Sequence, residues 1–230
     1  MFYFTSESAP LWTSVGLTAV YLAVIVVFAE ALNRLTEIGA ERTRKIVHIG
    51  AGNVILLAWV LKIPAWVGMS AAAIASLIAI ISYFLPILPS INSVGRKSLG
   101  TFFYAVSIGV LVGWFWSIDA PQYAAIGILV MAWGDGLAAL IGQRFGKHQY
   151  QLGGIQKSWE GSLVMAVASF SVTFLILSRF QDGNGAVAGV AVAVALFATA
   201  LEAFSQLGID NLSVPVGSAA LAYFLMSWLQ

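Results

Sequence analysis

Eight apolar segments, separated by short polar breaks, dominate this 230-residue sequence and decide what it can fold into. Apolar residues make up 60% of the chain and charged residues only 9%, against roughly 25% charged in a soluble domain. So few charges cannot cover a water-facing surface, and the apolar excess excludes a disordered chain. A membrane-spanning helix needs about 20 apolar residues. The sequence therefore predicts an all-α, polytopic membrane protein with about eight transmembrane helices.

The predicted spans cover residues 11–32, 46–61, 65–85, 99–117, 122–142, 161–178, 186–201 and 213–229. Segments 46–61 and 186–201 are short for full spans, so an alternative with seven spans stays open. Little sequence is left for loops. We therefore expect a single transmembrane domain over residues 1–230, with any functional site built from helix ends and short connections.

The basic residues predict the orientation, because Lys and Arg near the ends of spans stay cytoplasmic. Nine of the eleven lie in three connections, and the other two are Lys62 and Arg179. The nine are Arg34, Arg42, Arg44, Lys45, Arg96, Lys97, Arg144, Lys147 and Lys157. This bias predicts outside termini and cytoplasmic loops at 33–45, 86–98, 143–160 and 202–212.

Composition also limits the chemistry. The chain has no cysteine, which excludes disulfides, thiolate nucleophiles and Cys-type metal sites. Its formal net charge of +1 gives no reason to expect a nucleic-acid partner. The sequence leaves the oligomeric state open.

Asp135 lies inside the apolar segment 122–142, at helical spacing with Ala132, Ala139 and Gly142. Ionisable groups at membrane depth are costly and usually functional. An acid there needs a cation, and a metal ion or a lysine would serve. Two interpretations stay open: a helix-packing stripe whose one acid pairs with a neighbouring Lys, or a metal site.

The connection after this segment combines glycines with lysines. Glycines let a backbone approach phosphates, lysines supply positive charge, and the N-terminus of the next helix favours anions. A solvated basic loop is the alternative interpretation, and no GxxxxGK[ST] run is present. The candidate nucleotide contacts are Gly146, Lys147, Lys157, Ser158, Glu160 and Gly161.

Two further clusters fall on the same predicted side. Arg44, Lys45 and His48 can share one helix face as a patch for phosphate or a lipid head group, or as a basic anchor with a snorkelling His.

Glu202 precedes Asp210 and Asn211 near the C-terminal end of the chain. Helix capping would explain Asp210 or Asn211 but not Glu202. Asp135, Glu202 and Asp210 together offer oxygen ligands for Mg²⁺.

Three stretches resemble the CTP-dependent polyprenol kinase family, which includes dolichol kinase and phytol kinase. They are Asp135-Gly136-Leu137-Ala138-Ala139-Leu140-Ile141-Gly142 with Gly146-Lys147 and Lys157-Ser158-Trp159-Glu160-Gly161-Ser162, then Arg44-Lys45-Ile46-Val47-His48-Ile49-Gly50, and Asp210-Asn211-Leu212-Ser213-Val214-Pro215. The resemblance covers roughly residues 42 to 229 in order and spacing. The short length is more similar to phytol kinase than to dolichol kinase.

The resemblance implies transfer of the γ-phosphoryl group of CTP to a long-chain isoprenoid alcohol, with phytol favoured, giving phytyl phosphate and CDP for tocopherol or related lipids. It implies catalytic roles for Asp135, Lys157 and Asp210. It implies Mg²⁺ at Asp135, Asp210 and Glu202, and contacts to the acceptor or a phosphate from Arg44, Lys45, His48 and Asn211. The protein would be integral to the membrane, with its site on the cytoplasmic side, in a bacterial inner or thylakoid membrane if the chain is cyanobacterial.

Two other functions stay open. Cytidylyltransferases that act on lipid phosphates share a related pattern, but typically show Ser-Pro-Lys-Lys-Thr-x-Glu-Gly where this chain has Gln156-Lys157-Ser158-Trp159-Glu160-Gly161. The second open function is that of a non-enzymatic transporter. Transporters usually place polar groups at the bilayer midplane between inverted repeats, whereas here the polar groups crowd one side.

Overall fold

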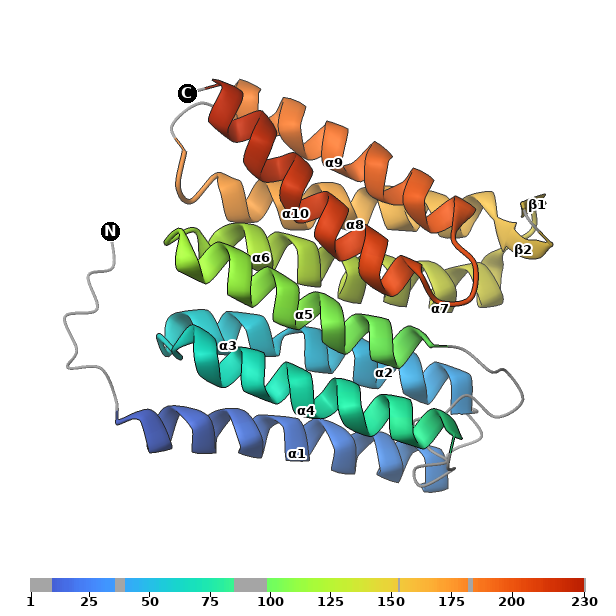
Figure 1. The fold of residues 1–230 in the computed structure, drawn as a ribbon. Coiled ribbons are helices and arrows are strands. Elements are labelled where there is room, and N and C mark those ends of the chain that lie inside the picture. The colour runs from blue at the N-terminus through green and yellow to red at the C-terminus, as the bar shows by residue number, and fades with distance from the viewer. Residues whose placement is uncertain (1–9, 36–39, 85–98, 153, 182–183, 230) are drawn as a thin grey trace.

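The computed structural model describes residues 10–35, 40–84, 99–152, 154–181 and 184–229, and these are almost entirely helical (Figure 1). The elements are α1 (Leu11–Leu35), α2 (Ala40–Gly52), α3 (Val54–Val60), α4 (Ala65–Phe84), α5 (Gly100–Ser117), α6 (Pro121–Leu129), the π-helix η1 (Val130–Asp135), α7 (Gly136–Phe145), the strands β1 (Gln149–Leu152) and β2 (Ile155–Ser158), α8 (Trp159–Leu177), α9 (Asn184–Phe204) and α10 (Asp210–Leu229). The predicted all-α membrane fold is confirmed.

Seven helices among the described residues are long and apolar enough to cross a membrane. The segment predicted at 186–201 is longer than expected, with an apolar run over Gly185–Phe204. The segment predicted at 46–61 is instead divided into α2 and α3. Figure 1 shows α2 and α3 following one another along the bundle beside the complete spans. Seven of the eight predicted segments are therefore continuous membrane-length helices, and the eighth runs along the bundle as the two shorter helices α2 and α3.

Asn53 marks the break between α2 and α3. Its amide nitrogen donates to the carbonyl of Ile49 at 3.2 Å, and its amide oxygen accepts from Trp133 Nε1 at 3.0 Å. Asn side chains that bond to the backbone offer it an alternative to the helical pattern. The same residue therefore interrupts the helix and ties it to η1.

The helices run back and forth along one axis, as Figure 1 shows. The start of α1 and the end of α10 lie at one end of the bundle, and the β1–β2 hairpin lies at the other. The hairpin end, which we call the site end, also holds the end of α1, the start of α2 and the α9–α10 connection. The predicted loop 86–98 falls outside the described residues, but α4 ends and α5 begins at this same end.

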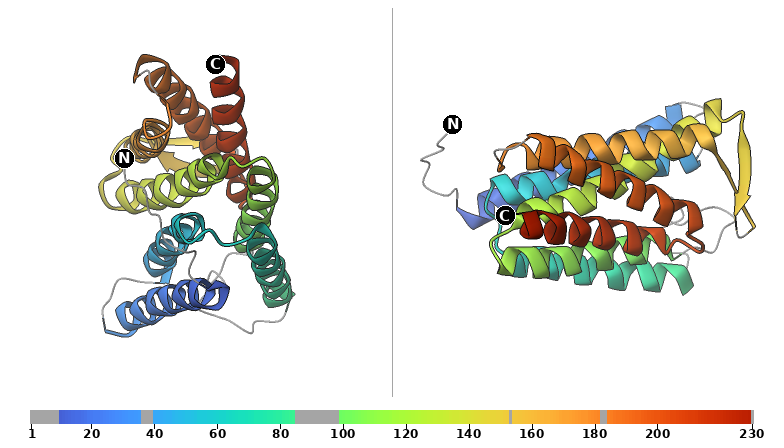
Figure 2. Two further views of the ribbon diagram at one scale, coloured as in Figure 1. Left: turned by 90° about the vertical axis from the view of Figure 1, so that its left-hand side faces the viewer. Right: turned by 90° about the horizontal axis from the view of Figure 1, so that it is seen from above.

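The continuous helix α6–η1–α7 forms the centre of the bundle, and the end-on view in Figure 2 shows it surrounded by other helices. In the most apolar stretch of this helix, 72% of the residues are buried inside the protein. In the corresponding stretch of α1, only 6% are buried. The main apolar core gathers around α6, with Leu111 and Phe115 from α5, Met165 from α8 and Val214 from α10. Asp135 therefore belongs to the best-packed helix of the structure.

Two glycines let α2 approach this central helix closely. A Cβ added to Gly52 would lie 2.3 Å from Ala132 Cβ, and one added to Gly136 would lie 2.5 Å from Ile49 Cγ1. Cβ atoms do not approach other heavy atoms so closely, so neither position has room for a side chain. Small residues at helix interfaces in membranes serve this kind of packing.

We expect Gly52→Ala to destabilise the protein by about 2 kcal/mol, as overpacking does, because the new methyl group would force α2 away from η1. Thermal unfolding of the purified protein in detergent measures the change. Gly189→Ala in α9 is the matched control, since nothing lies within 4 Å of its added Cβ. An unchanged midpoint for Gly52→Ala would contradict the close packing of α2 on η1.

Candidate active site

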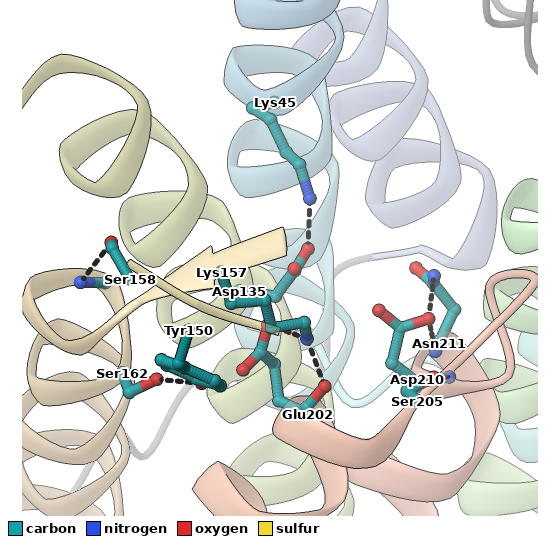
Figure 3. A network of polar contacts seen from close by, with 11 residues as sticks. Lys45, Asp135, Tyr150, Lys157, Ser158, Ser162, Glu202, Ser205, Asp210 and Asn211 are labelled. Atoms are coloured by element: carbon teal, nitrogen blue, oxygen red, sulfur yellow. Dashed lines mark hydrogen bonds and ion pairs between the residues drawn. The ribbon is translucent and has the colours of Figure 1, made fainter. Parts of the chain in front are cut away.

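Asp135 is the last residue of the π-helix η1, whose wider turns interrupt the α-helical pattern between α6 and α7. Such π-helical turns inside α-helices are rare and frequent at functional sites. The Asp135 side chain is only 10% exposed and forms an ion pair with Lys45 Nζ from α2 (Figure 3). Of the two interpretations of Asp135, the structure shows the acid paired with a lysine.

Lys157 and Glu202 form a second ion pair at the site end. Lys157 lies on β2, and its ammonium group donates to both the carboxylate and the backbone carbonyl of Glu202 at the end of α9 (Figure 3). Both side chains are nearly buried, at 15% and 12% exposed. The two lysines therefore neutralise the two most buried carboxylates of the site.

Residues 149–158, which fall in a predicted loop, form an antiparallel hairpin in which Tyr150 pairs with Lys157 and Leu152 with Ile155. Gly154 lies in the connection between the two strands and has a φ of 83°, a conformation that favours glycine. In the sequence, two glycines between alternating residues are a standard hairpin signal. Gly154 thus serves at least to turn the chain, and the hairpin fixes the position of Lys157.

The hairpin is fastened to the start of α8. Glu160 accepts hydrogen bonds from the backbone N–H of His148, at 3.2 Å, and pairs with its ring Nδ1 at 2.7 Å. The hydroxyl groups of Tyr150 and Ser162 lie 2.6 Å apart. Glu160, a predicted nucleotide contact, therefore holds the hairpin in place. Lys147, which precedes His148 in the chain, is exposed.

Ser158 caps α8 by accepting a hydrogen bond from the backbone N–H of Gly161 at 3.1 Å. The glycines beside it permit close packing. A Cβ on Gly146 would lie 2.3 Å from the carbonyl oxygen of Gly142, and one on Gly161 would lie 3.0 Å from that of Ala138. These glycines bring α7, the hairpin and α8 together around one space.

That space is a cavity of about 290 Å³ at the site end, between α7, the hairpin, α8 and the end of α9. Five predicted site residues line it: Asp135, Lys157, Ser158, Gly161 and Glu202. Other lining side chains include three glutamines, Gln143, Gln149 and Gln156. The predicted contacts Gly146, Lys147 and Glu160 are close in the chain but do not line the cavity.

Asp210 and Asn211 begin α10 and lie beside Glu202 on the side away from the hairpin (Figure 3). The backbone N–H of Asp210 donates to Ser205 Oγ at 2.6 Å, and Asp210 Oδ1 accepts from the Asn211 side chain at 3.1 Å. These bonds fix the α9–α10 turn, in which Ser205 accepts from the first backbone N–H of α10. Both residues remain half-buried at the rim of the site.

The three acids predicted to hold Mg²⁺ share this end of the bundle. Asp135, Glu202 and Asp210 lie within electrostatic range of one another. In the part of the chain that the structure describes, however, no three His, Asp or Glu side chains form a group able to hold an ion by themselves. Nucleotide-bound Mg²⁺ usually takes one or two carboxylates and completes its shell with phosphate oxygens and water. These three acids therefore fit a site for nucleotide-bound Mg²⁺ better than a site in which protein side chains alone hold the ion.

His48 follows Lys45 by one helical turn and packs against Tyr104 of α5, with ring centroids 4.3 Å apart. Arg44 is half-buried on the same helix. Tyr104 was missed in the sequence, because a tyrosine in an apolar segment looks like an ordinary core residue. Only the packing of α5 beside α2 reveals it as a neighbour of the site.

The fold and the site define an integral membrane protein that carries a charged cavity at one end of a helical bundle. The chain is 60% identical to the phytol kinase of Synechocystis sp. over 214 residues, which are 93% of this chain and 92% of that protein. The chain therefore belongs to the phytol kinase family.

More distant relatives agree. Phytol kinase 1 of Arabidopsis thaliana is 28% identical over 91% of this chain and 75% of its own length. The farnesol kinase of the same plant is 28% identical over 80% of this chain and 64% of its own length. No family model matches the chain, and no solved structure matches it.

Breaking the Lys45–Asp135 pair should be costly, because removing one partner leaves an uncompensated buried charge. We expect Lys45→Met to destabilise the protein by about 3 kcal/mol, and Lys45→Met combined with Asp135→Asn to recover most of that loss. Thermal unfolding in detergent measures both.

Arg34→Met is the control for this prediction. It removes an exposed pair with Glu30, 2.6 Å between Nε and Oε1, and exposed pairs contribute little. A Lys45→Met protein as stable as the wild type would show that Asp135 does not depend on Lys45 in the folded protein.

Proposed function

We propose that this protein is a lipid kinase that transfers the γ-phosphoryl group of CTP to the hydroxyl of a long-chain isoprenoid alcohol, with phytol as the favoured acceptor. The observation that carries the proposal is the cavity lined by Lys157, Asp135 and Glu202 at the end of a membrane bundle. The names of the relatives support the kinase activity and phytol. The motif resemblance supports CTP.

The location suits the two substrates. The isoprenoid alcohol dissolves in the bilayer, whereas the nucleotide is aqueous, so a site at the ends of spanning helices is accessible to both. The excess of Lys and Arg in the connections at this end supports a cytoplasmic orientation. We infer that the products are phytyl phosphate and CDP, and that phytyl phosphate feeds tocopherol synthesis.

Phosphoryl transfer depends on positioning and on charge neutralisation more than on covalent chemistry by the protein. Lys157 would hold the phosphates, and it must leave Glu202 to do so. This exchange frees the Glu202 carboxylate beside Asp135. Mg²⁺ bound with the nucleotide would be held by these carboxylates and would neutralise charge on the phosphate oxygens.

The alcohol oxygen then forms a bond to the γ-phosphorus as the bond from that phosphorus to the β,γ-bridging oxygen breaks. CDP carries away the electrons of the broken bond, and the hydroxyl proton passes to a carboxylate of the site, Asp135 or Asp210. Arg44 and Lys45 would balance the charge of the lipid phosphate beside these acids, and the Asn211 amide would donate a hydrogen bond to it.

The experiment that tests the function is incubation of the purified protein with Mg²⁺, phytol and each of four nucleoside triphosphates labelled on the γ-phosphate. We expect labelled phytyl phosphate and CDP from CTP, with much less product from the other nucleotides. Release of pyrophosphate from a phytyl phosphate substrate would indicate a cytidylyltransferase instead. Transport of phytol with no phosphorylated product would indicate a transporter.

In the same assay we expect Lys157→Ala to lower kcat with CTP by at least about 100-fold, comparable to losing one preorganised electrostatic contact. The KM for phytol should change little, because the alcohol reaches the site from the bilayer. Lys62→Ala, in the α3–α4 connection at the opposite end, is the matched control and should behave as the wild type. Unchanged CTP kinetics with impaired phytol saturation in Lys157→Ala would place the nucleotide elsewhere.

A further inference from the structure

Two buried polar atoms beside the site have no hydrogen-bond partner among the described residues: the Tyr104 hydroxyl and His48 Nε2. Both atoms are enclosed, and Tyr104 as a whole is only 8% exposed. A buried polar group without a partner is costly, and most of all in a membrane protein, where bulk water is far away. Such groups are retained when a ligand supplies the missing bonds or when strain serves a function.

The two atoms belong to rings that face one another. The centroids of His48 and Tyr104 lie 4.3 Å apart with the planes tilted by 41°. A hydroxyl group both donates and accepts a hydrogen bond, so a single hydroxyl can join a phenol to an imidazole nitrogen in either tautomer. The two atoms together offer the hydrogen bonds that one hydroxyl group can make.

Asp135 connects this pair to the cavity. Its carboxylate lines the cavity that also contains Lys157 and Glu202. The same carboxylate interacts electrostatically with His48 and with Tyr104. A group bound at the ring pair would therefore sit on one side of Asp135, and a nucleotide phosphate in the cavity on the other. Phosphoryl transfer requires the acceptor oxygen and the phosphate to meet in this way.

The ring pair also lies where α2 meets α5. α2 packs on α1, η1 and α7, whereas α5 packs mainly on α4, α6 and α10.

From these observations we propose that the hydroxyl of the acceptor alcohol binds between Tyr104 Oη and His48 Nε2, which makes Tyr104 an acceptor-binding residue. The inference rests on the proposed function for the identity of the alcohol. It goes beyond that function by assigning the acceptor hydroxyl to the α2–α5 boundary rather than to the cavity that holds the nucleotide.

Binding measured without catalysis tests the inference separately from the activity. Tryptophan fluorescence of the purified protein in detergent is titrated with phytol and with phytane, the saturated hydrocarbon without a hydroxyl. We expect the wild type to prefer phytol about tenfold, as one hydrogen bond allows, and Tyr104→Phe to lose most of that preference. Phytane affinity should not change, because the substitution removes one oxygen and leaves the ring.

Tyr123→Phe is the matched control, since Tyr123 is a buried tyrosine near the start of α6, at the opposite end of the bundle. It should keep the wild-type preference. His48→Gln is the second variant, used if Tyr104→Phe does not fold, and it should also lower the preference. In the kinase assay Tyr104→Phe should raise the KM for phytol with the KM for CTP unchanged.

Three results would overturn the inference. A Tyr104→Phe protein that keeps the wild-type preference would show that water alone satisfies these atoms. Equal weakening of phytol and phytane would show that Tyr104 acts only through packing. A preference lost equally in Tyr123→Phe would show that the effect is not local. If the wild type binds phytol with this preference but does not phosphorylate it, the proposed function fails while the binding site stands.

Discussion

Two buried lysine–carboxylate pairs, Lys45–Asp135 and Lys157–Glu202, are the interactions on which the site depends. Each charge is nearly excluded from water, where an unpaired ion would be very costly. The pairs tie α2 to the central helix and the hairpin to the end of α9. Within each pair the lysine neutralises the carboxylate. An incoming phosphate can exchange partners with them, because Lys157 can leave a carboxylate for a phosphate oxygen.

The fold serves these pairs by bringing backbones close together. Gly52 and Gly136 remove the side chains that would keep α2 from the central helix, and the π-helix ends at Asp135. The hairpin, held by Glu160 and the Tyr150–Ser162 contact, carries Lys157 over the cavity. The charged groups are thus positioned by rigid packing, which favours catalysis by a preorganised electrostatic environment.

Much of this architecture could be predicted from the sequence, because long apolar segments and the Lys and Arg bias follow from the properties of the bilayer. Asp135, Lys157 and Glu202 stood out as charges near apolar segments. Which acid pairs with which lysine could not be predicted, since Lys45 and Asp135 are far apart in the chain and only the packing of α2 brings them together. The hairpin was missed although Gly153-Gly154 between alternating residues signals one. The break at Asn53 depends on Trp133 from another helix, a contact that local sequence does not contain.

The central claim is that nucleotide phosphates take Lys157 from Glu202 and leave that carboxylate for Mg²⁺. Calorimetric titration of CDP, with and without Mg²⁺, into the wild type and Glu202→Gln tests it most directly, with the exposed Glu30→Gln as control. The account predicts that Mg²⁺ strengthens CDP binding about tenfold in the wild type, a typical coupling between two ligands. In Glu202→Gln, CDP should bind more tightly without Mg²⁺, because Lys157 no longer has to leave a carboxylate, and the Mg²⁺ effect should disappear. The same affinity and the same Mg²⁺ effect in Glu202→Gln as in the wild type would contradict the exchange.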